Sequence, residues 1–513
     1  MPLTRREFLI GAGAVAGVSI VGVGGPAFGA PVDPAAARRN RLVVVFLEGG
    51  NDGLNTVVPR GDVPGAPRYS VYKKVRPAIG YASSLPLALD RTPDDAAQLL
   101  GFNPKLANLH ALYREGRVAV VQGVDYPNHN YSHFASSDIW HAGNPTNTAT
   151  GWIGRHLDRV GVGEGELRAV AVSPKLPLML QGHGVSGASI ASINAMRFAD
   201  ASNPFGNTRH FALSAMGATR PGDPLRQRVG ATLRQTVDVV ADLNKTQAPD
   251  AAGSPAATSL LTARTLLEQN LGVECVYVGA GGFDTHTTEV SRQEQLLTEL
   301  DGAISAFWSG MNPVLASRTV IMIVSEFGRR IGENGAGGVA GTDHGAAAPV
   351  LLVAAPGSLL VGGLHGDHPA MGTALAPADN LTMTTDVRHV YQAVLQSWLA
   401  DPDPLYSDAS TGPLHGLFAS EPTTTIPGET RIGTAATLDR SDVTTSTSTG
   451  VLGKTPRRGA RLGARTDAAT HGRAVPVSSA AAALAFNAFA AAIVLRSGRF
   501  RAALDDWRTR AES

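Results

Sequence analysis

The chain has 513 residues, of which 43% are hydrophobic and 17% are charged, and its formal net charge is +1. A chain of this length can bury a large core, and these proportions exclude a disordered protein. The near-neutral charge gives no general attraction to nucleic acid, so we expect no nucleic-acid partner. The single cysteine, Cys275, excludes an intramolecular disulfide, and its apolar neighbours predict a buried thiol.

The first thirty residues resemble an export signal. Arg5 and Arg6 stand before an uncharged segment rich in Gly, Ala and Val, and the tripeptide Ala27-Phe28-Gly29 follows. This pattern predicts a twin-arginine signal cleaved near Gly29 or Ala30. A retained anchor helix is the competing interpretation, but the apolar segment is short and rich in glycine. We expect the twin-arginine export machinery as a partner and a periplasmic, cell-envelope or secreted location.

An unbroken apolar run at residues 42–47 predicts a strand buried on both faces of a sheet. It ends in Gly49-Gly50-Asn51-Asp52-Gly53, where the glycines permit an unusual turn and present one carboxylate. Open α/β sheets bind ligands outside the carboxyl ends of their strands. Asp52 is therefore a candidate ligand, and the alternative is that it caps a turn.

A second buried strand is predicted at residues 117–124, after a helix at residues 103–113. The polar loop that follows enters another predicted helix carrying Ser132, Ser136 and Ser137. The start of a helix offers free backbone amides that suit an anion, so each serine is a candidate nucleophile. Capping of the helix is the competing interpretation for each of them.

The middle of the chain changes in character. Residues 151–158 indicate the start of a helix and residues 169–172 a strand, whereas residues 196–270 are polar with helical periodicity. We interpret this last stretch as a helical insertion or cap rather than as part of a site.

The pattern of strand, glycine and acid then recurs. A strand is followed by Asp284 and His286, and the strand at residues 320–324 is followed by Glu326. A glycine-rich loop leads to Asp343 and His344. The other elements expected here are an amphipathic helix at residues 291–308, a strand at residues 349–354 and a helix at residues 386–399.

Carboxylates and imidazoles gathered at one sheet edge are ligands that hard or borderline divalent metals bind. We expect one or two ions of zinc, calcium or manganese. The competing interpretation is that the acids cap turns or pair with Arg329 and Arg330. The candidate metal ligands are Asp52, Asp284, His286, Glu326, Asp343 and His344.

The predicted fold is α/β, with a doubly wound and mostly parallel sheet sandwiched by helices. We expect a signal peptide at residues 1–30, one domain at residues 40–420 and a low-complexity linker and tail at residues 421–513. The tail contains an alanine-rich apolar run at residues 479–495, which is shorter than the roughly 20 residues that span a membrane. We therefore expect no membrane contact from the tail.

Six motifs together resemble the domain of unknown function 1501 (DUF1501) family, over roughly residues 40–420. That family is similar to the alkaline phosphatase and sulfatase superfamily. The resemblance implies an alkaline-phosphatase-like core, metals at the carboxyl edge of the sheet, and a Ser, Thr or modified Cys nucleophile at the start of a helix. The motifs are FLEGGNDGLNTVVP, SHFASSDIW, GWIGRHLD, GGFDTH, SEFGRR and GTDHG.

Residue by residue, Asp52 matches the superfamily's metal ligand after the first strand, and Asp284 with His286 resembles its Asp/His pair. His344 resembles a late histidine ligand. Glu326 stands where an Asp-His dipeptide is usual, and Phe327 replaces that histidine. The resemblance then leaves two possibilities, that His133 substitutes for the lost ligand or that the site holds a single metal.

These observations predict an exported, metal-dependent hydrolase of phosphate or sulfate esters. Its substrate would be a small anionic ester or a component of the cell envelope, with Arg155 or Arg329 holding the anion. The alternative is a non-catalytic exported binding or assembly protein on a degenerate phosphatase-like fold.

Overall fold

The computed structural model describes residues 39–62, 68–87, 99–161, 167–193, 253–269, 271–372, 374–402, 405 and 412–419. The predicted signal at residues 1–30 and the predicted tail at residues 421–513 lie outside these ranges, as does most of the predicted helical insertion. Within the described ranges, no helix has both the length and the apolar character needed to cross a membrane.

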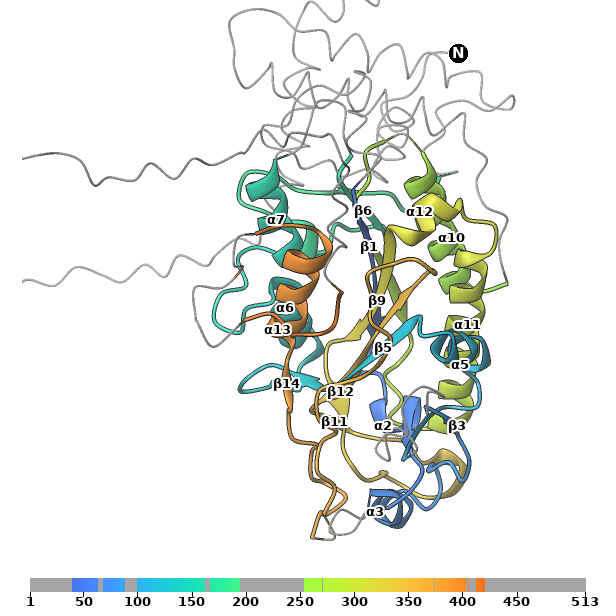
Figure 1. Cartoon of the computed structure of the whole chain (residues 1–513). Helices are drawn as coiled ribbons and strands as arrows, with labels where there is room; N and C mark the ends of the chain where they lie inside the picture. The colour runs from blue at the N-terminus through green and yellow to red at the C-terminus, as the bar shows by residue number, and fades with distance from the viewer. Residues whose placement is uncertain are drawn as a thin grey trace, which may run out of the picture. The chain divides into compact units, whose positions relative to one another are not determined.

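A nine-stranded sheet lies at the centre of the described chain (Figure 1). Eight strands follow the order β13-β5-β12-β9-β1-β8-β6-β7, and β14 pairs with β5. β12 is antiparallel to both of its neighbours, and every other pairing in this sheet is parallel. The strands are β1 (Arg41–Glu48), β5 (Val118–Asp125), β6 (Ala169–Val172), β7 (Ala188–Ser189), β8 (Cys275–Gly281), β9 (Thr319–Ser325), β12 (Ala348–Ala354), β13 (Gly363–His365) and β14 (Thr385–Asp386).

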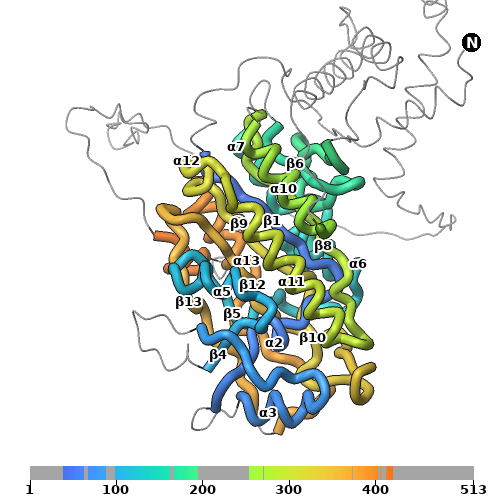
Figure 2. The backbone as a smooth tube through the Cα atoms, turned by 90° about the vertical axis from the view of Figure 1, so that its right-hand side faces the viewer, coloured from blue at the N-terminus to red at the C-terminus, as the bar shows by residue number. Residues whose placement is uncertain are grey.

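Helices cover both faces of this sheet, as the views in Figures 1 and 2 show. On one face lie α5 (Ala107–Arg114), α10 (Pro255–Glu268), α11 (Glu289–Trp308) and α12 (Pro313–Ser317). On the other face lie α6 (His133–Ala142), α7 (Trp152–Val160), α13 (Val387–Ala393) and the π-helical turn η6 (Val394–Trp398). The predicted doubly wound, mostly parallel sheet sandwiched by helices is confirmed.

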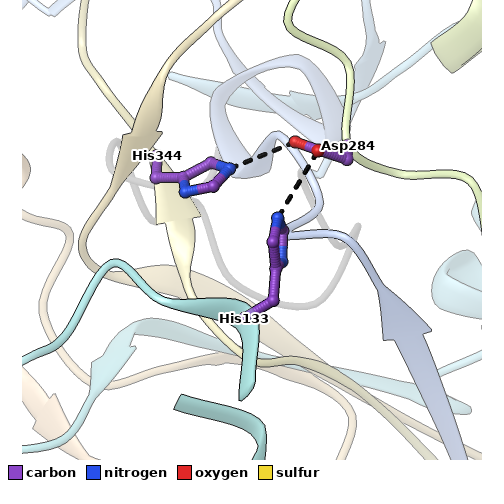
Figure 3. Close-up of side chains that lie close together, drawn as sticks. All are labelled: His133, Asp284 and His344. Carbon is purple, nitrogen blue, oxygen red and sulfur yellow. Dashed lines mark hydrogen bonds and ion pairs between the residues drawn. The ribbon is translucent and has the colours of Figure 1, made fainter. Parts of the chain in front are cut away.

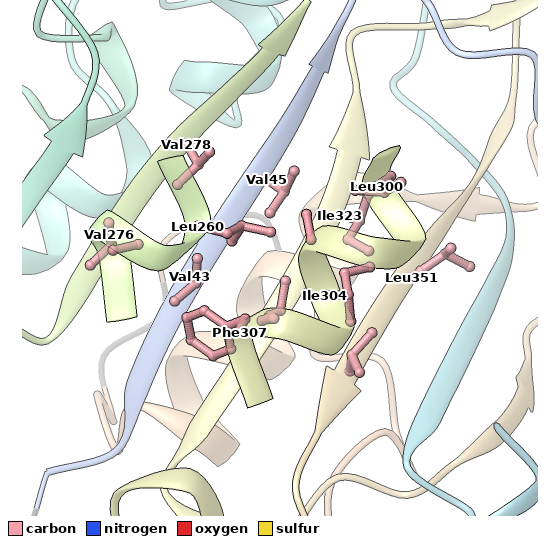
Figure 4. Packing of buried hydrophobic residues seen from close by; sticks show 14 of the residues in the cluster. Val43, Val45, Leu260, Val276, Val278, Leu300, Ile304, Phe307, Ile323 and Leu351 are labelled. Atoms are coloured by element: carbon pink, nitrogen blue, oxygen red, sulfur yellow. The ribbon is translucent and has the colours of Figure 1, made fainter. Parts of the chain in front are cut away.

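Strand β1 is an unbroken apolar run because it is buried on both faces of the sheet. Val43, Val45 and Leu47 belong to the core beneath α10 and α11, whereas Leu42, Val44 and Phe46 belong to the core on the opposite face. Figure 4 shows Val43 and Val45 packed with Ile304 and Phe307 of α11. Burying each such side chain contributes about 1.5–3 kcal/mol, so both alternating sets of β1 stabilise the fold.

One stretch differs from the sequence-based interpretation, and one small sheet stands apart from the central sheet. The end of the presumed insertion, α10, is a core helix, because Leu260 and Leu266 are buried against the sheet. The stretch after β1 also holds a small antiparallel sheet in the order β2-β4-β3. The remaining elements are α2 (Gly53–Thr56), β2 (Val57–Pro59), α3 (Arg68–Val75), β3 (Leu85–Pro86), β4 (Leu100–Phe102), η3 (Leu178–Leu180), β10 (Gly328–Arg329), η5 (Gly337–Val339) and β11 (His344–Gly345).

A buried ion network joins elements at the amino edge of the sheet. His156 of α7 is fully buried, with Nδ1 2.8 Å from Asp401 Oδ2 and Nε2 3.4 Å from Glu274 Oε1. Arg159 pairs with Asp401, and Arg168 pairs with Glu274. Burial alone would lower the pKa of His156, but its hydrogen bonds to Asp401 and Glu274 raise it. The network therefore ties α7 to the residue before β8 and to the chain after η6.

Replacing His156 with leucine is expected to lower the free energy of unfolding by about 3 kcal/mol, because it removes the buried imidazole that bridges two buried carboxylates and leaves each with one arginine partner. The full difference in the free energy of unfolding between wild type and variant is present below the ordinary histidine pKa of about 6.5. It shrinks as the pH rises through the raised pKa of His156 in the folded state. Urea denaturation of both proteins across this pH range measures the difference.

His141→Leu is the matched control, because burial lowers the pKa of His141 to about 4. The unfolded chain then binds the proton more readily, so the wild type loses stability relative to this variant as the pH falls. A stability difference for His156→Leu that grows with rising pH would contradict the assigned charge state.

Candidate metal centre

The candidate site lies at the carboxyl ends of the parallel strands. His133 is the first residue of α6, which follows β5, and Asp284 and His286 follow β8. His344 arrives from β11, which is held beside Arg329 of β10 in a short antiparallel ladder. Strand ends that are far apart in the sequence therefore supply side chains to one place.

His133, Asp284 and His344 converge, as Figure 3 shows. Their candidate ligand atoms all lie within 4.8 Å of one another, and they form the one such group of three among the described residues. His133 Nε2 is 3.4 Å from Asp284 Oδ2, and His344 Nε2 is 3.2 Å from Asp284 Oδ1. His133 and His344 are half-buried and Asp284 is exposed, so the group is open to solvent.

His286 adds a third imidazole at the margin of this group. Its Nε2 lies 3.1 Å from Asp284 Oδ1 and 2.9 Å from His344 Nε2. Ligand atoms bound tetrahedrally at the roughly 2.0–2.1 Å typical of zinc lie about 3.3–3.4 Å apart. The observed separations are close to that spacing.

Each of the three imidazoles directs its other nitrogen at an oxygen. His133 Nδ1 is 2.8 Å from Glu326 Oε1, His344 Nδ1 is 2.8 Å from the Tyr131 carbonyl, and His286 Nδ1 is 3.2 Å from Asp343 Oδ1. A carbonyl or carboxylate oxygen only accepts, so these contacts suit rings that carry the proton on Nδ1, and we assign that tautomer to each. In that tautomer the Nε2 lone pairs face one another and Asp284.

Two lone pairs cannot face each other at 2.9 Å unless a positive charge lies between them, as at His286 and His344. A proton on one ring or a metal ion satisfies that requirement. Metal-binding histidines usually donate their second nitrogen to a carboxylate or a carbonyl, which is the arrangement of all three rings. The residues present therefore fit a divalent cation, with nitrogen-rich ligands that suit zinc.

Arg329 fixes the carboxylate of Asp284. Its buried guanidinium donates to Asp284 Oδ1 at 2.7 Å and to the carbonyls of Gly50 at 2.6 Å and Thr342 at 2.7 Å. Partial burial alone would raise the pKa of Asp284, but the hydrogen bond and the charge of Arg329 help to lower it to about 2. Asp284 is therefore ionised at any pH at which the protein would work.

The other predicted acidic ligands lie behind or beside this group. Glu326 is buried, where it accepts hydrogen bonds from the Gly49 amide at 2.8 Å and from His133. Asp343 is exposed, and its Oδ1 contacts Asn334 at 2.7 Å as well as His286. Both acids thus orient the imidazoles that face the centre.

Asp52 is placed away from the imidazoles. Its Oδ1 caps α2 by accepting from the amides of Leu54 at 3.1 Å and Asn55 at 3.4 Å, and its Oδ2 pairs with the buried Arg76. Asp52 therefore caps a turn, which is the alternative that its sequence leaves open beside metal binding. The nearby Gly50 has a φ of 73°, and a Cβ there would come within 2.2 Å of the Phe327 ring.

The three candidate serines differ in exposure. Ser136 is fully buried, and its hydroxyl donates to the Glu326 carbonyl at 2.5 Å. Ser137 is half-buried in the first turns of α6. Ser132 is exposed at the N-cap of α6, and its side chain makes no capping hydrogen bond.

The two arginines considered for anion binding both have structural contacts. Arg155 donates to the carbonyls of Thr150 and Ala142, each at 2.7 Å, and these belong to the segment that leads into α7. Arg329 is enclosed by the carbonyls and the carboxylate that it holds. Neither guanidinium therefore serves as an open anion site in this arrangement.

A family model described as a protein of unknown function (DUF1501) matches residues 118–413. This span exceeds half of the chain, so the chain belongs to the DUF1501 family, and the membership predicted from its motifs is confirmed. No curated protein matches the sequence.

Solved structures similar to this chain include the zinc complex of the C-terminal periplasmic domain of EptC from Escherichia coli. That structure is 10% identical, with a TM-score of 0.29, and the match covers 65% of this chain and 78% of EptC. The PH0037 protein from Pyrococcus horikoshii is 14% identical with a TM-score of 0.25, covering 62% and 86%. A TAB5 alkaline phosphatase mutant with magnesium in its M3 site is 9% identical with a TM-score of 0.26, covering 62% and 91%.

Nitrogen NMR of the metal-free protein is expected to find the ring proton of His344 on Nδ1, because Nδ1 faces a carbonyl. Burial lowers the pKa of His344, so its ring should stay neutral below the ordinary histidine range of about 6.5. His365 is the matched control, since its Nε2 lies 2.8 Å from the Val361 carbonyl and should carry the proton instead. A proton found on Nε2 of His344 would rule out the ligand geometry described above.

Proposed function

We propose that this member of the DUF1501 family is a metal-dependent hydrolase of phosphate or sulfate esters. In this proposal His133, Asp284 and His344 hold a divalent cation, with His286 as a further nitrogen ligand. The observation that supports it most directly is that three imidazole Nε2 atoms face one ionised carboxylate, while each Nδ1 is held by an oxygen.

A divalent cation bound there would supply Lewis-acid chemistry, polarising an ester oxygen and lowering the pKa of a water molecule. The chain's own groups have the task of orienting the ligands. Glu326 holds the ring of His133, the Tyr131 carbonyl holds the ring of His344, and Arg329 keeps Asp284 in position. These fixed contacts limit the rearrangement needed when the site is filled.

The start of α6 supplies groups for the anionic part of the ester. The side chain of Ser132 does not cap the helix, and among the described residues no hydrogen bond occupies the amides of His133, Phe134 and Ala135. Such amides, together with the helix dipole, favour a negatively charged oxygen. Because His133 begins this same helix, the amides lie next to a proposed metal ligand.

The cellular setting is part of the same proposal. The twin-arginine motif at residues 1–30 supports export to the periplasm, the cell envelope or the medium. The substrate proposed is a small anionic ester or a cell-envelope component that carries one.

Substitution Asp284→Asn is expected to weaken zinc binding by more than about 100-fold and to abolish hydrolysis of aryl phosphate and aryl sulfate esters, because it removes the shared anionic ligand. Zinc binding is measured by titration and hydrolysis by release of the phenol. His129→Ala is the control, since His129 lies in the same loop as the start of α6 but contacts Tyr131. Unchanged zinc binding in Asp284→Asn would refute the site. A zinc-bound wild type that hydrolyses neither ester would instead support the non-catalytic alternative.

Ser132 is the serine that we propose as nucleophile, because its exposed hydroxyl is uncommitted at the start of α6. Ser132→Ala should retain zinc but lose at least about 10³-fold in turnover, as expected for removal of a covalent nucleophile. Ser137→Ala provides the comparison for a neighbouring hydroxyl. Retained turnover in Ser132→Ala would show that water attacks the ester without a serine intermediate.

A further inference from the structure

A fixed guanidinium already neutralises the carboxylate that follows β1. Asp52 and Arg76 are both fully buried, and they form an ion pair. Arg76 also donates through Nε to the Ile331 carbonyl at 2.7 Å and through a terminal nitrogen to the Arg330 carbonyl at 2.8 Å. Three contacts from two segments therefore hold this cation in place.

A second buried acid, Glu289 at the start of α11, stands beside this pair. Its Oε1 accepts from Asn55 Nδ2 at 2.9 Å, and its Oε2 accepts from Thr342 Oγ1 at 2.6 Å. Burial first, and then the charge of Asp52, raise the pKa of Glu289 well above its usual value. Arg76 thus favours the charged form of Asp52, whereas burial favours the neutral form of Glu289.

The ring of Phe327 packs against two of the imidazoles and against the glycine turn that follows β1. Phe327 is buried, with its ring centroid 4.9 Å from that of His133 and 4.6 Å from that of His344. It also meets Gly50, two residues before Asp52, so closely that a Cβ there would overlap the ring. A phenyl ring has no lone pair with which to coordinate a cation, and it excludes water from the space that it fills.

We infer that the site holds one divalent cation per chain, and that Arg76 takes the place of a second one. This inference rests on the proposed metal centre, because it concerns the number of ions that the centre holds. A second ion beside Asp52 would have to displace a buried guanidinium that has three partners, and Phe327, which packs on the same turn, offers it no ligand atom. Asp52 and Glu289 are thus positioning residues, which hold Arg76 and the segment that leads to His344.

Metal stoichiometry tests this inference without any measurement of activity. The full chain is saturated with Zn²⁺, passed through a desalting column, and examined by native mass spectrometry and elemental analysis. One zinc ion per chain is expected. Two ions per chain would overturn the inference while leaving the proposed hydrolase intact, and no bound ion would overturn both.

The substitution Glu289→Gln further distinguishes a site with one ion from a site with a second ion beside Asp52. It replaces the carboxyl group with a neutral amide of the same size, so the fold and the single zinc ion should be retained with unchanged affinity. Asp284→Asn is the opposing variant and should lose the ion. Loss of an ion in Glu289→Gln, with Asp284→Asn still holding one, would show that the acids beside Arg76 bind metal and would overturn the inference.

Discussion

The buried guanidinium of Arg329 is the contact on which the geometry of the centre depends. It donates to carbonyls in the turn after β1, in the turn after β8 and in the segment before β11, and also to the carboxylate of Asp284. A buried cation without such partners would cost several kcal/mol, so these segments must close around it when the chain folds. Their closure sets the position of Asp284 and brings His344 beside it. The centre is therefore fixed by the same ion that stabilises the loops around it.

The sheet and most of its helices could be predicted because each is encoded by a local pattern. The unbroken apolar run of β1 requires burial on both faces, and α11 carries its apolar residues at helical spacing. The direction of β12 could not be predicted, because its residues would suit a parallel strand equally well. β13 and β14 are too short to leave a pattern, and their pairing with β5 depends on the chain around them.

The same limit explains what the sequence revealed about the centre. Asp284, His286 and His344 follow strand ends, and this position was enough to bring them to one edge. A carboxylate after a strand looks alike in the sequence whether it faces a cation or an arginine. The partner of Asp52 is Arg76, 24 residues away, and only the folded chain brings them together. The sequence offers His133 only as a possible substitute for the histidine that Phe327 replaces. The direction of its side chain depends on the point at which α6 begins.

The three carboxylates that follow β1, β8 and β9 differ in their exposure to solvent. The side chains of Asp52 and Glu326 are 0% and 2% exposed and have partners within the protein, whereas Asp284 is 45% exposed. A cation arriving from solvent therefore meets the accessible carboxylate of Asp284 among the imidazoles, and it need not displace a buried pair. Glu326 and Asp343 lie behind these rings rather than toward the ion. A divalent ion held beside the amides of α6 would concentrate positive charge where a doubly charged phosphate ester, or a singly charged sulfate ester, is proposed to bind.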